Sequence, residues 1–486
     1  MQKALIVGAG IAGLATSIRL AQKGYEVHVY ESNSYAGGKL TSFQKEGYRF
    51  DAGPSLFTSP HLVTELFELA GEKPEDFFEY RRMDNICNYF WEDGTRFSMP
   101  AKRSEQIDAI HNAFSVSKKK IQSYLERNEQ KYKLTAPLFI ERSLHKFSSF
   151  WDVKVMKALM KMHKLDTFKT LHQLNNEQFQ NKKLVQLMDR FATYNGSSPY
   201  KTSGIMSMIP HLEMDGGTYF PEGGMHSITQ SLLELARRQG VEFHFEMPVE
   251  EVTHKEGRIT GIRAKGQNIE GDLVVINADI YTAYEKLIRN VKKPEKILKQ
   301  ERSSSALIFY WGIKRTFEEL DLHNILFSDS YEEEFDFIFN KKQIHDDPTI
   351  YVNISSKENK ADAPDGCENW FVMINTPSDQ GQNWSEMIEK ARKDIIHKIN
   401  RILGIDIGTL IQCEEILYPG LIASKTSSHQ GALYGTSSNS RYAAFLRHAN
   451  FSGKIKNLYF CGGSVHPGGG IPLCLNSAKI VSNFIA

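Results

Sequence analysis

The chain has 486 residues, and its 59 Lys and Arg residues nearly balance 58 Asp and Glu residues, for a formal net charge of +1. A chain of this length exceeds one ordinary hydrophobic core, so about two or three domains are expected. The balanced charge and the 41% content of hydrophobic residues are typical of a globular protein, and they argue against a disordered chain or a nucleic-acid partner.

The five cysteines form no CxxC pair and show no Cys/His spacing typical of a metal site. We therefore expect neither a disulfide framework nor a bound metal, and we expect a reducing, cytoplasmic environment. The first strand pattern begins at Ala4 without a signal peptide before it, and nowhere do about 18 apolar residues run together. Any membrane contact is accordingly expected to be peripheral.

The N-terminal segment has the pattern of a βαβ unit. Ala4–Val7 is a short apolar run, typical of a parallel strand buried on both faces, and the glycine motif GAGIAG follows at residues 8–13. A helical pattern then continues to a stop at Gly24, and residues 26–31 have the pattern of a second strand.

Each glycine of the motif has a physical task in binding a dinucleotide. Gly8 permits a tight turn, Gly10 lets the backbone approach a pyrophosphate, and Gly13 lets helix and strand pack closely. The phosphates would lie at the helix N-terminus, where free N–H groups favour anions. Glu31 ends the second strand, where its carboxylate can accept hydrogen bonds from a ribose diol, and no arginine follows to bind a 2′-phosphate.

The next residues favour FAD over NAD. Gly-Gly-Lys at 37–39 lies just past the acid, and a second glycine-containing segment follows at 47–55. Here the sequence resembles the large flavoprotein group of amine oxidases and carotenoid desaturases, in which a GG(R/K) segment contacts the dinucleotide. Lysine replaces the usual arginine, which keeps the positive charge but loses the planar fork. The resemblance implies cofactor contacts by Gly38, Lys39, Ser55 and Leu56.

Residues 142–169 combine many basic residues with aromatic and apolar ones. This mixture has two interpretations that weigh about equally: an interfacial helix attracted to anionic lipid, or a basic surface helix packed on its own domain.

Further along the chain, residues 385–403 have an apolar face at helical spacing, which predicts an amphipathic packing helix.

Between residues 241 and 279, strand patterns alternate with glycines. Leu273–Ile276 is another apolar run typical of a buried strand, and Asn277 follows it directly. The family resemblance implies that Val249 meets the adenine through its backbone and that the later strand returns near the cofactor at Asn277. The alternative interpretation is that both are ordinary core strands.

The C-terminal segment 457–478 has the pattern of a strand, a glycine-rich loop and a helix beginning near Pro472. Clustered glycines let the backbone approach a planar ligand, and the helix N-terminus would face the anionic locus of a reduced flavin. This motif resembles that of the bacterial phytoene desaturase type. Gly463 stands where many related flavoproteins have aspartate, so ribitol binding would depend on backbone. The resemblance implies contacts by Leu433, Gly462, Gly463, Gly470, Ile471 and Pro472.

These patterns predict an α/β protein with two domains. A Rossmann-like FAD-binding domain would be assembled from residues 1–71, 216–290 and 451–486. An α+β substrate-binding domain would comprise residues 72–215 and 291–450, including a candidate helical membrane-contacting region at 142–169.

The resemblance implies an FAD-dependent oxidoreductase that introduces a C–C double bond into a long apolar polyene by hydride transfer to flavin. HPGGGIPLCL, at 466–475, is slightly more similar to the 1-hydroxycarotenoid 3,4-desaturases than to enzymes acting on phytoene. The electron acceptor would be oxygen or a quinone. No catalytic residue is assigned, because the sequence has no GxSxG or HExxH motif and His466 beside Pro467 is more often a loop-shaping residue than a base.

Four alternatives remain open at the level of sequence. Within the desaturases, the substrate could be phytoene or dehydrosqualene. A carotenoid isomerase would use FAD without net oxidation, and an amine oxidase would need an aromatic pair that is not evident beside the terminal loop. A prenyl-binding protein of the same architecture would lack a working flavin, so the absorbance of bound flavin would exclude it.

Overall fold

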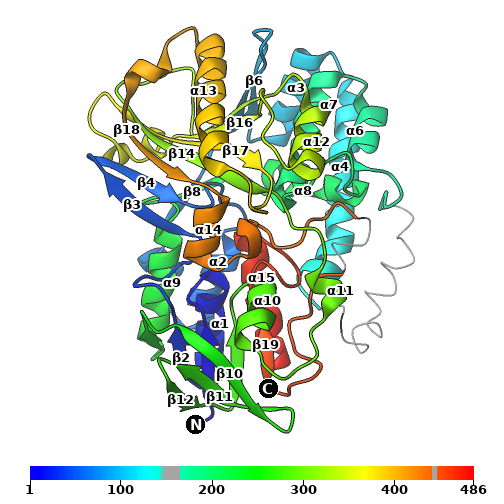
Figure 1. Cartoon of the computed structure of the whole chain (residues 1–486). Helices are drawn as coiled ribbons and strands as arrows, with labels where there is room; N and C mark the ends of the chain where they lie inside the picture. Colours follow the sequence, from blue (N-terminus) through cyan, green and yellow to red (C-terminus); the bar gives the residue numbers. More distant parts are fainter. Residues whose placement is uncertain (144, 146–164, 441–445) are drawn as a thin grey trace.

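The structure is a computed structural model that describes residues 1–143, 145, 165–440 and 446–486. Two main sheets organise it, one near the end that carries both termini and one in the opposite half (Figure 1). Most of the candidate membrane-contacting region 142–169 lies outside the described residues.

The first sheet is parallel and has the strand order β19-β13-β1-β2-β9. Because all five strands run in the same direction, their carboxyl ends meet at one edge. Ala4 and Ile6 contact one hydrophobic cluster while Leu5 and Val7 contact another, so β1 is buried on both faces, as its apolar run predicted. The strands are β1 (Lys3–Val7), β2 (Glu26–Tyr30), β9 (Glu242–His244), β13 (Leu273–Ile276) and β19 (Leu458–Phe460).

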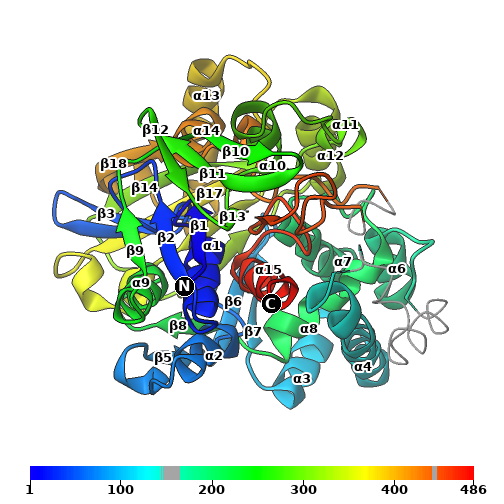
Figure 2. The same ribbon diagram turned by 90° about the horizontal axis from the view of Figure 1, so that it is seen from below.

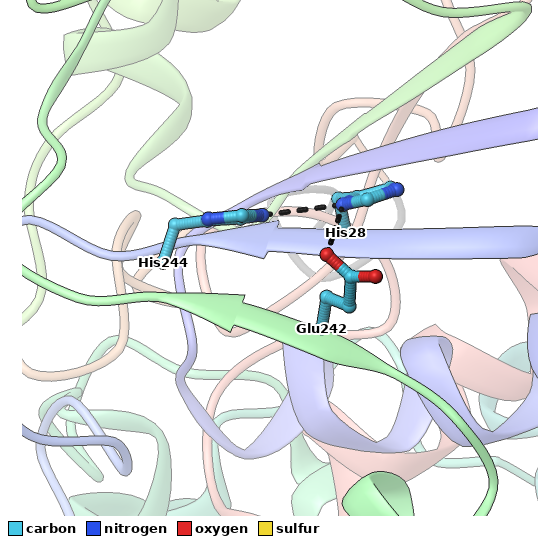
Figure 3. A group of neighbouring side chains, drawn as sticks. All are labelled: His28, Glu242 and His244. Atoms are coloured by element: carbon cyan, nitrogen blue, oxygen red, sulfur yellow. Dashed lines mark hydrogen bonds and ion pairs between the residues drawn. The ribbon is translucent and has the colours of Figure 1, made fainter.

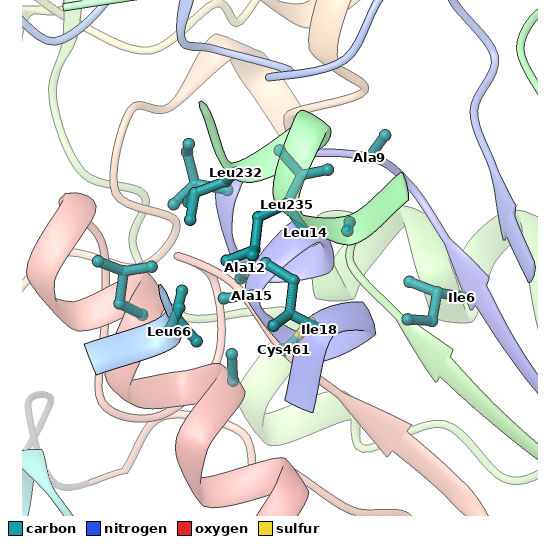
Figure 4. Close-up of a cluster of buried hydrophobic side chains, with 14 of the residues drawn as sticks. Ile6, Ala9, Ala12, Leu14, Ala15, Ile18, Leu66, Leu232, Leu235 and Cys461 are labelled. Atoms are coloured by element: carbon teal, nitrogen blue, oxygen red, sulfur yellow. The ribbon is translucent and has the colours of Figure 1, made fainter. Parts of the chain in front are cut away.

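Helix α1 (Ile11–Ala21) lies on one face of this sheet, and its residues 11–20 are all buried. A helix that is buried on every side must be surrounded by other elements. Figures 2 and 4 show these neighbours, with Leu14 and Ile18 packed near Leu232 and Leu235. The contacting helices are α2 (His61–Leu69), α9 (Ser227–Arg238) and α15 (Ile471–Phe484).

The other face of the parallel sheet is covered by a three-stranded antiparallel sheet. Its two turns contain Gly257 and Gly266, whose φ angles of +71° and +74° suit glycine. The strands are β10 (Val249–Lys255), β11 (Arg258–Ala264) and β12 (Gln267–Glu270), followed after β13 by the short helix α10 (Ile280–Thr282).

The second main sheet is mostly antiparallel, with the order β18-β14-β17-β16-β15-β6-β7. Helix α13 (Trp384–Leu403) packs on one face through Ala391, Ile395 and Ile399, which confirms the amphipathic helix predicted there. The strands are β6 (Asn85–Phe90), β7 (Arg96–Pro100), β14 (Ser305–Ile313), β15 (His323–Leu326), β16 (Ile350–Asn353), β17 (Glu368–Thr376) and β18 (Ile411–Leu417).

The structure also has two small two-stranded sheets, one formed by β3 (Thr41–Lys45) and β4 (Tyr48–Ala52) and the other by β5 (Tyr80–Arg82) and β8 (Tyr219–Pro221). The sheet of β3 and β4 packs against the second main sheet, where Phe43 and Phe50 contact Tyr310. Among the described residues, the remaining α-helices are α3 (Arg103–Phe114), α4 (Lys118–Thr135), α6 (Leu171–Phe179), α7 (Lys182–Asp189), α8 (Ile209–Met214), α11 (Glu295–Leu298), α12 (Tyr331–Asp336) and α14 (Pro419–Thr426).

The strands of the parallel sheet all come from residues 1–71, 216–290 and 451–486, and those of the seven-stranded sheet from 72–215 and 291–450. The domain boundaries themselves stay a prediction. Within the described part of the chain, none of the helices combines the length and the apolar character needed to cross a membrane.

Candidate active site

A cavity of about 1280 Å³ is lined by the carboxyl ends of the parallel strands and by residues of the seven-stranded sheet. Ligands of open parallel sheets bind at this edge, because the loops after the strands leave a crevice there. Fifteen of the predicted cofactor contacts line the cavity, and Gly13 does not. They are Gly8, Gly10, Glu31, Gly38, Lys39, Ser55, Leu56, Val249, Asn277, Leu433, Gly462, Gly463, Gly470, Ile471 and Pro472.

The glycine loop after β1 is closely packed around Asn277. Gly8 has a φ of +102°, and the Asn277 amide donates a hydrogen bond to its carbonyl oxygen at 3.3 Å. A Cβ atom at Gly10 would lie 2.9 Å from Asn277 Nδ2, and one at Gly13 would lie 2.2 Å from the Gly8 carbonyl oxygen. Gly13 therefore acts by packing and not by lining the cavity. No side chain caps α1, so the first N–H groups of the helix are available to an anion.

Glu31 follows β2 and is held by backbone N–H groups. Its Oε2 accepts from Ala9 N at 2.8 Å, and its Oε1 accepts from Asn33 N at 2.9 Å. The Ser32 hydroxyl and the Asn33 amide also donate to Oε1. A carboxylate has about four acceptor positions, so Oε2 keeps room for a ribose hydroxyl.

Lys39 binds protein backbone. Its Nζ donates to the carbonyl oxygens of Ala432 at 3.2 Å and Leu433 at 3.0 Å. Burial lowers the pKa of Lys39, although Asp279 opposes this shift. The amine thus fastens the segment around Leu433 to the loop after Glu31, and it lines the cavity from that position.

The C-terminal loop presents backbone to the cavity. Gly470 has a φ of +105°, and a Cβ atom there would have no protein atom within 4 Å. Helix α15 begins next, again without a side-chain cap. Asn450 holds the loop from behind by donating to the carbonyl oxygens of Phe460 at 3.2 Å and His466 at 2.7 Å. This open backbone surface suits a flat ring.

His466 shapes this loop and does not line the cavity. Its Nε2 lies 2.7 Å from the carbonyl oxygen of Arg142, and the side chain is buried. Burial lowers its pKa to about 4, so the neutral ring donates through Nε2. Of the two interpretations of His466, the structure favours loop shaping.

The wall of the cavity contains a buried polar cluster that was not predicted from the sequence. Arg190 forms an ion pair with Glu213, Tyr194 donates to the same carboxylate, and the Arg190 guanidinium donates to Tyr89 Oη at 2.6 Å. Burial opposes charge on Arg190, but Glu213 raises its pKa well above the ordinary value. No motif in the sequence marks this cluster, because Arg190 and Glu213 lie 23 residues apart.

Gly196, two residues after Tyr194, lies across the Tyr434 side chain from the C-terminal loop, because Cβ atoms added at Gly196 and at Gly469 would each lie 2.8 Å from the Tyr434 ring. A second polar chain faces the cavity, in which Tyr351 Oη lies 2.8 Å from Ser55 Oγ and 2.8 Å from His323 Nδ1. Apolar side chains line the cavity elsewhere, among them Ile308, Ile325, Phe371, Met373 and Leu417.

Comparison with known proteins identifies the family. Residues 11–485 match the family described as flavin containing amine oxidoreductase. The chain is 53% identical to a 1-hydroxycarotenoid 3,4-desaturase of Flavobacterium sp., over 100% of this chain and 99% of that protein. It is 30% identical to a 4,4′-diapolycopene oxygenase of Methylomonas sp., over 100% of this chain and 98% of that protein.

Among solved structures, putrescine oxidase bound to putrescine superposes with a TM-score of 0.64, over 100% of this chain and 98% of that one. At 13% identity this likeness shows the fold alone. The family match and the full-length relatives show that the chain belongs to the flavin-containing amine oxidoreductases. Within that family it belongs to the carotenoid desaturases, which are FAD-dependent enzymes that act on CH–CH groups. The α/β flavoprotein fold, FAD and the desaturase family, which the glycine motifs indicated, are thereby confirmed.

Proposed function

We propose that the protein desaturates the 3,4 bond of an acyclic 1-hydroxycarotenoid. The observation that carries this proposal is the buried polar cluster of Arg190, Tyr194 and Glu213, which lines a cavity that also has many apolar side chains in its wall. In such a substrate C1 is only two bonds from C3, so the hydroxyl lies close to the reacting bond. A relative with that activity is 53% identical.

The residues of the cavity fit FAD. The glycine loop and the uncapped α1 suit the pyrophosphate, Glu31 suits the adenosine ribose, and the backbone from Gly470 to Pro472 suits the flavin ring. FAD bound there would supply the hydride acceptor for oxidation of the polyene. The chain itself would orient the polyene, the conjugated substrate would delocalise the positive charge left at the reacting carbon, and loss of a proton from the neighbouring carbon would complete the double bond.

For hydroxyl recognition, Tyr194 is the residue that the geometry favours. Its hydroxyl donates to Glu213 and accepts from Arg190 Nη1 at 3.2 Å, which leaves one oxygen lone pair able to accept from a substrate hydroxyl at the cavity surface. Glu213 is fixed by Arg190 on its other side, so Tyr194 is held in one orientation.

We expect the purified flavoprotein to convert an acyclic 1-hydroxycarotenoid to the product with one additional double bond. With Tyr194→Phe, kcat/KM for this substrate should fall about tenfold, because one hydrogen bond to the substrate is lost, while kcat/KM for the parent carotenoid without the hydroxyl stays unchanged. Product analysis by chromatography and absorbance provides the measurement.

The matched control is Tyr284→Phe, which removes the same hydroxyl from a buried tyrosine outside the cavity. Equal loss of kcat/KM on both substrates in Tyr194→Phe would contradict hydroxyl recognition. Exclusive formation of products from phytoene or dehydrosqualene would contradict the substrate assignment, and a rearranged product without loss of hydrogen would indicate an isomerase.

We also propose peripheral contact with anionic membranes, since a long apolar substrate partitions into lipid and residues 142–169 combine basic with aromatic residues. Flotation with acidic liposomes should decrease when Lys154, Lys157 and Lys161, which lie outside the described residues, become glutamate. The same change at the exposed residues 118–120 of α4 is the control. Flotation that is absent, or equal in the two triple variants, would contradict the proposal.

A further inference from the structure

Two histidines and a glutamate meet at the edge of the parallel sheet, and none of them lines the cavity (Figure 3). His28 lies on β2, and Glu242 and His244 lie on the edge strand β9. The strands pair in the register His28 to Glu242 and Tyr30 to His244. Since side chains two residues apart point to the same face of a strand, all three groups project to one side of the sheet.

Their ligand atoms have the spacing that a small metal ion requires. His28 Nδ1 lies 3.2 Å from His244 Nε2 and 3.3 Å from Glu242 Oε2. With metal–ligand bonds of about 2.0 to 2.1 Å in a tetrahedral site, ligand atoms are about 3.3 Å apart. Two of the three pairs thus already have this spacing, and all the ligand atoms lie within 4.8 Å of one another.

A second carboxylate fixes His28 in the form that binds metal. Glu26 Oε1 lies 2.8 Å from His28 Nε2, and Lys3 holds Glu26 through an ion pair at 3.0 Å. When His28 donates through Nε2, the lone pair on Nδ1 faces His244 and Glu242. A carboxylate behind the metal-binding histidine is the usual arrangement in metal sites, where it fixes the tautomer and increases ligand basicity.

Without a cation, this geometry leaves an electrostatic conflict. The His28 Nδ1 lone pair can accept a hydrogen bond from the His244 Nε2–H, but the Glu242 carboxylate oxygen then faces an acceptor at 3.3 Å. A positive charge between the groups removes the conflict, and it comes either from a second proton on His28 or from a metal ion.

We propose that His28, Glu242 and His244 form a binding site for a divalent transition metal of the Zn²⁺ type, with water as the remaining ligand. Two imidazoles and one carboxylate are a ligand set that Zn²⁺ accepts, and the 66% exposure of the Glu242 side chain leaves the site open to solvent. The bound ion would clamp β9 to β2.

The clamp would act beside the cofactor site. The carbonyl oxygen of His244 accepts a hydrogen bond from Glu31 N at 2.9 Å, so the strand that carries the metal ligand also positions the backbone of Glu31. The site thus has a structural task at the edge of the sheet and takes no part in the oxidation.

The test is titration of the purified flavoprotein with Zn²⁺ against a chromophoric chelator, together with thermal unfolding. We expect one Zn²⁺ per chain and a rise of a few degrees in the unfolding temperature. Affinity should be lost in His244→Ala and in Glu242→Gln. It should fall about tenfold in Glu26→Gln, which removes only the carboxylate behind His28. His61→Ala, at an exposed histidine of α2, should bind as the parent does.

Binding that is unchanged in both His244→Ala and Glu242→Gln would overturn the proposal, since another group such as a free cysteine would then hold the ion. The absence of binding at about 100 μM Zn²⁺, far above the affinity of a protein site with three ligands, would also overturn it. These readouts are independent of desaturation, so they are unaffected if the proposed substrate is wrong.

Discussion

Replacing Gly470 with valine is expected to remove FAD from the protein while the fold is retained. The Gly470 φ of +105° is a conformation that a β-branched residue rarely adopts, at a cost of about 1–3 kcal/mol. A Cβ atom there would have no protein atom within 4 Å, so its bulk would project into the cavity where we place the flavin ring. Flavin absorbance per chain should fall several-fold while the far-UV circular dichroism spectrum is preserved.

The matched control is Gly381→Val. Gly381 also has a positive φ, +91°, and open space around its Cβ position, but it does not line the cavity. This control separates backbone strain from obstruction of the ring. If Gly470→Val keeps its flavin with an unchanged spectrum and desaturates at the parent rate, the C-terminal loop does not lie against the flavin.

Replacing Glu31 with alanine is expected to weaken FAD binding by at least about tenfold. The carboxylate lies at the carboxyl end of β2, lines the cavity and keeps acceptor capacity on Oε2. Each charge-assisted hydrogen bond to a ribose hydroxyl contributes about 1.5–3 kcal/mol. The measurement is the dissociation constant of FAD from the reconstituted apoprotein, by flavin fluorescence.

The carboxylate also accepts from the backbone of Ala9 and Asn33, so the substitution removes local support for the glycine loop. The unfolding temperatures of the parent and Glu31→Ala apoproteins report this loss of support alone, because neither protein then has FAD to contact. Glu31→Gln, which retains one carbonyl acceptor, should have an intermediate affinity for FAD. Full flavin occupancy at unchanged affinity in Glu31→Ala would show that the ribose lies elsewhere.

The N-terminal unit was predictable because its geometry is set by neighbouring residues. The apolar run before Gly8 gave a strand buried on both faces, and helix α1 follows within the motif. Close contact between Gly13 and the Gly8 carbonyl oxygen is a constraint within six residues of sequence. The same holds for the loop and helix after β19, where the glycines and Pro472 mark the helix start.

The remaining features depend on contacts between distant residues. Glu213 meets Arg190 through the packing of α8 against the segment after α7, and no motif marks that contact. His28 and His244 are neighbours only because β9 pairs with β2, which makes two isolated histidines into one cluster. The spacing of Cys and His residues along the sequence therefore does not indicate this candidate metal site. Lys39 likewise binds carbonyl groups almost 400 residues away, with separations of 393 and 394.

The order of strands in the parallel sheet has a consequence for how the cell makes this enzyme. β1 is synthesised first, yet one edge of the sheet is completed by β19, which begins at Leu458, and the glycine-rich loop before α15 comes later still. With FAD bound as we propose, a nascent chain on the ribosome would present the loop for the phosphates long before the surface for the flavin ring exists. We therefore expect stable FAD binding to follow the end of translation, and we expect chains that stop before residue 458 to lack bound flavin and to be recognised by chaperones and proteases.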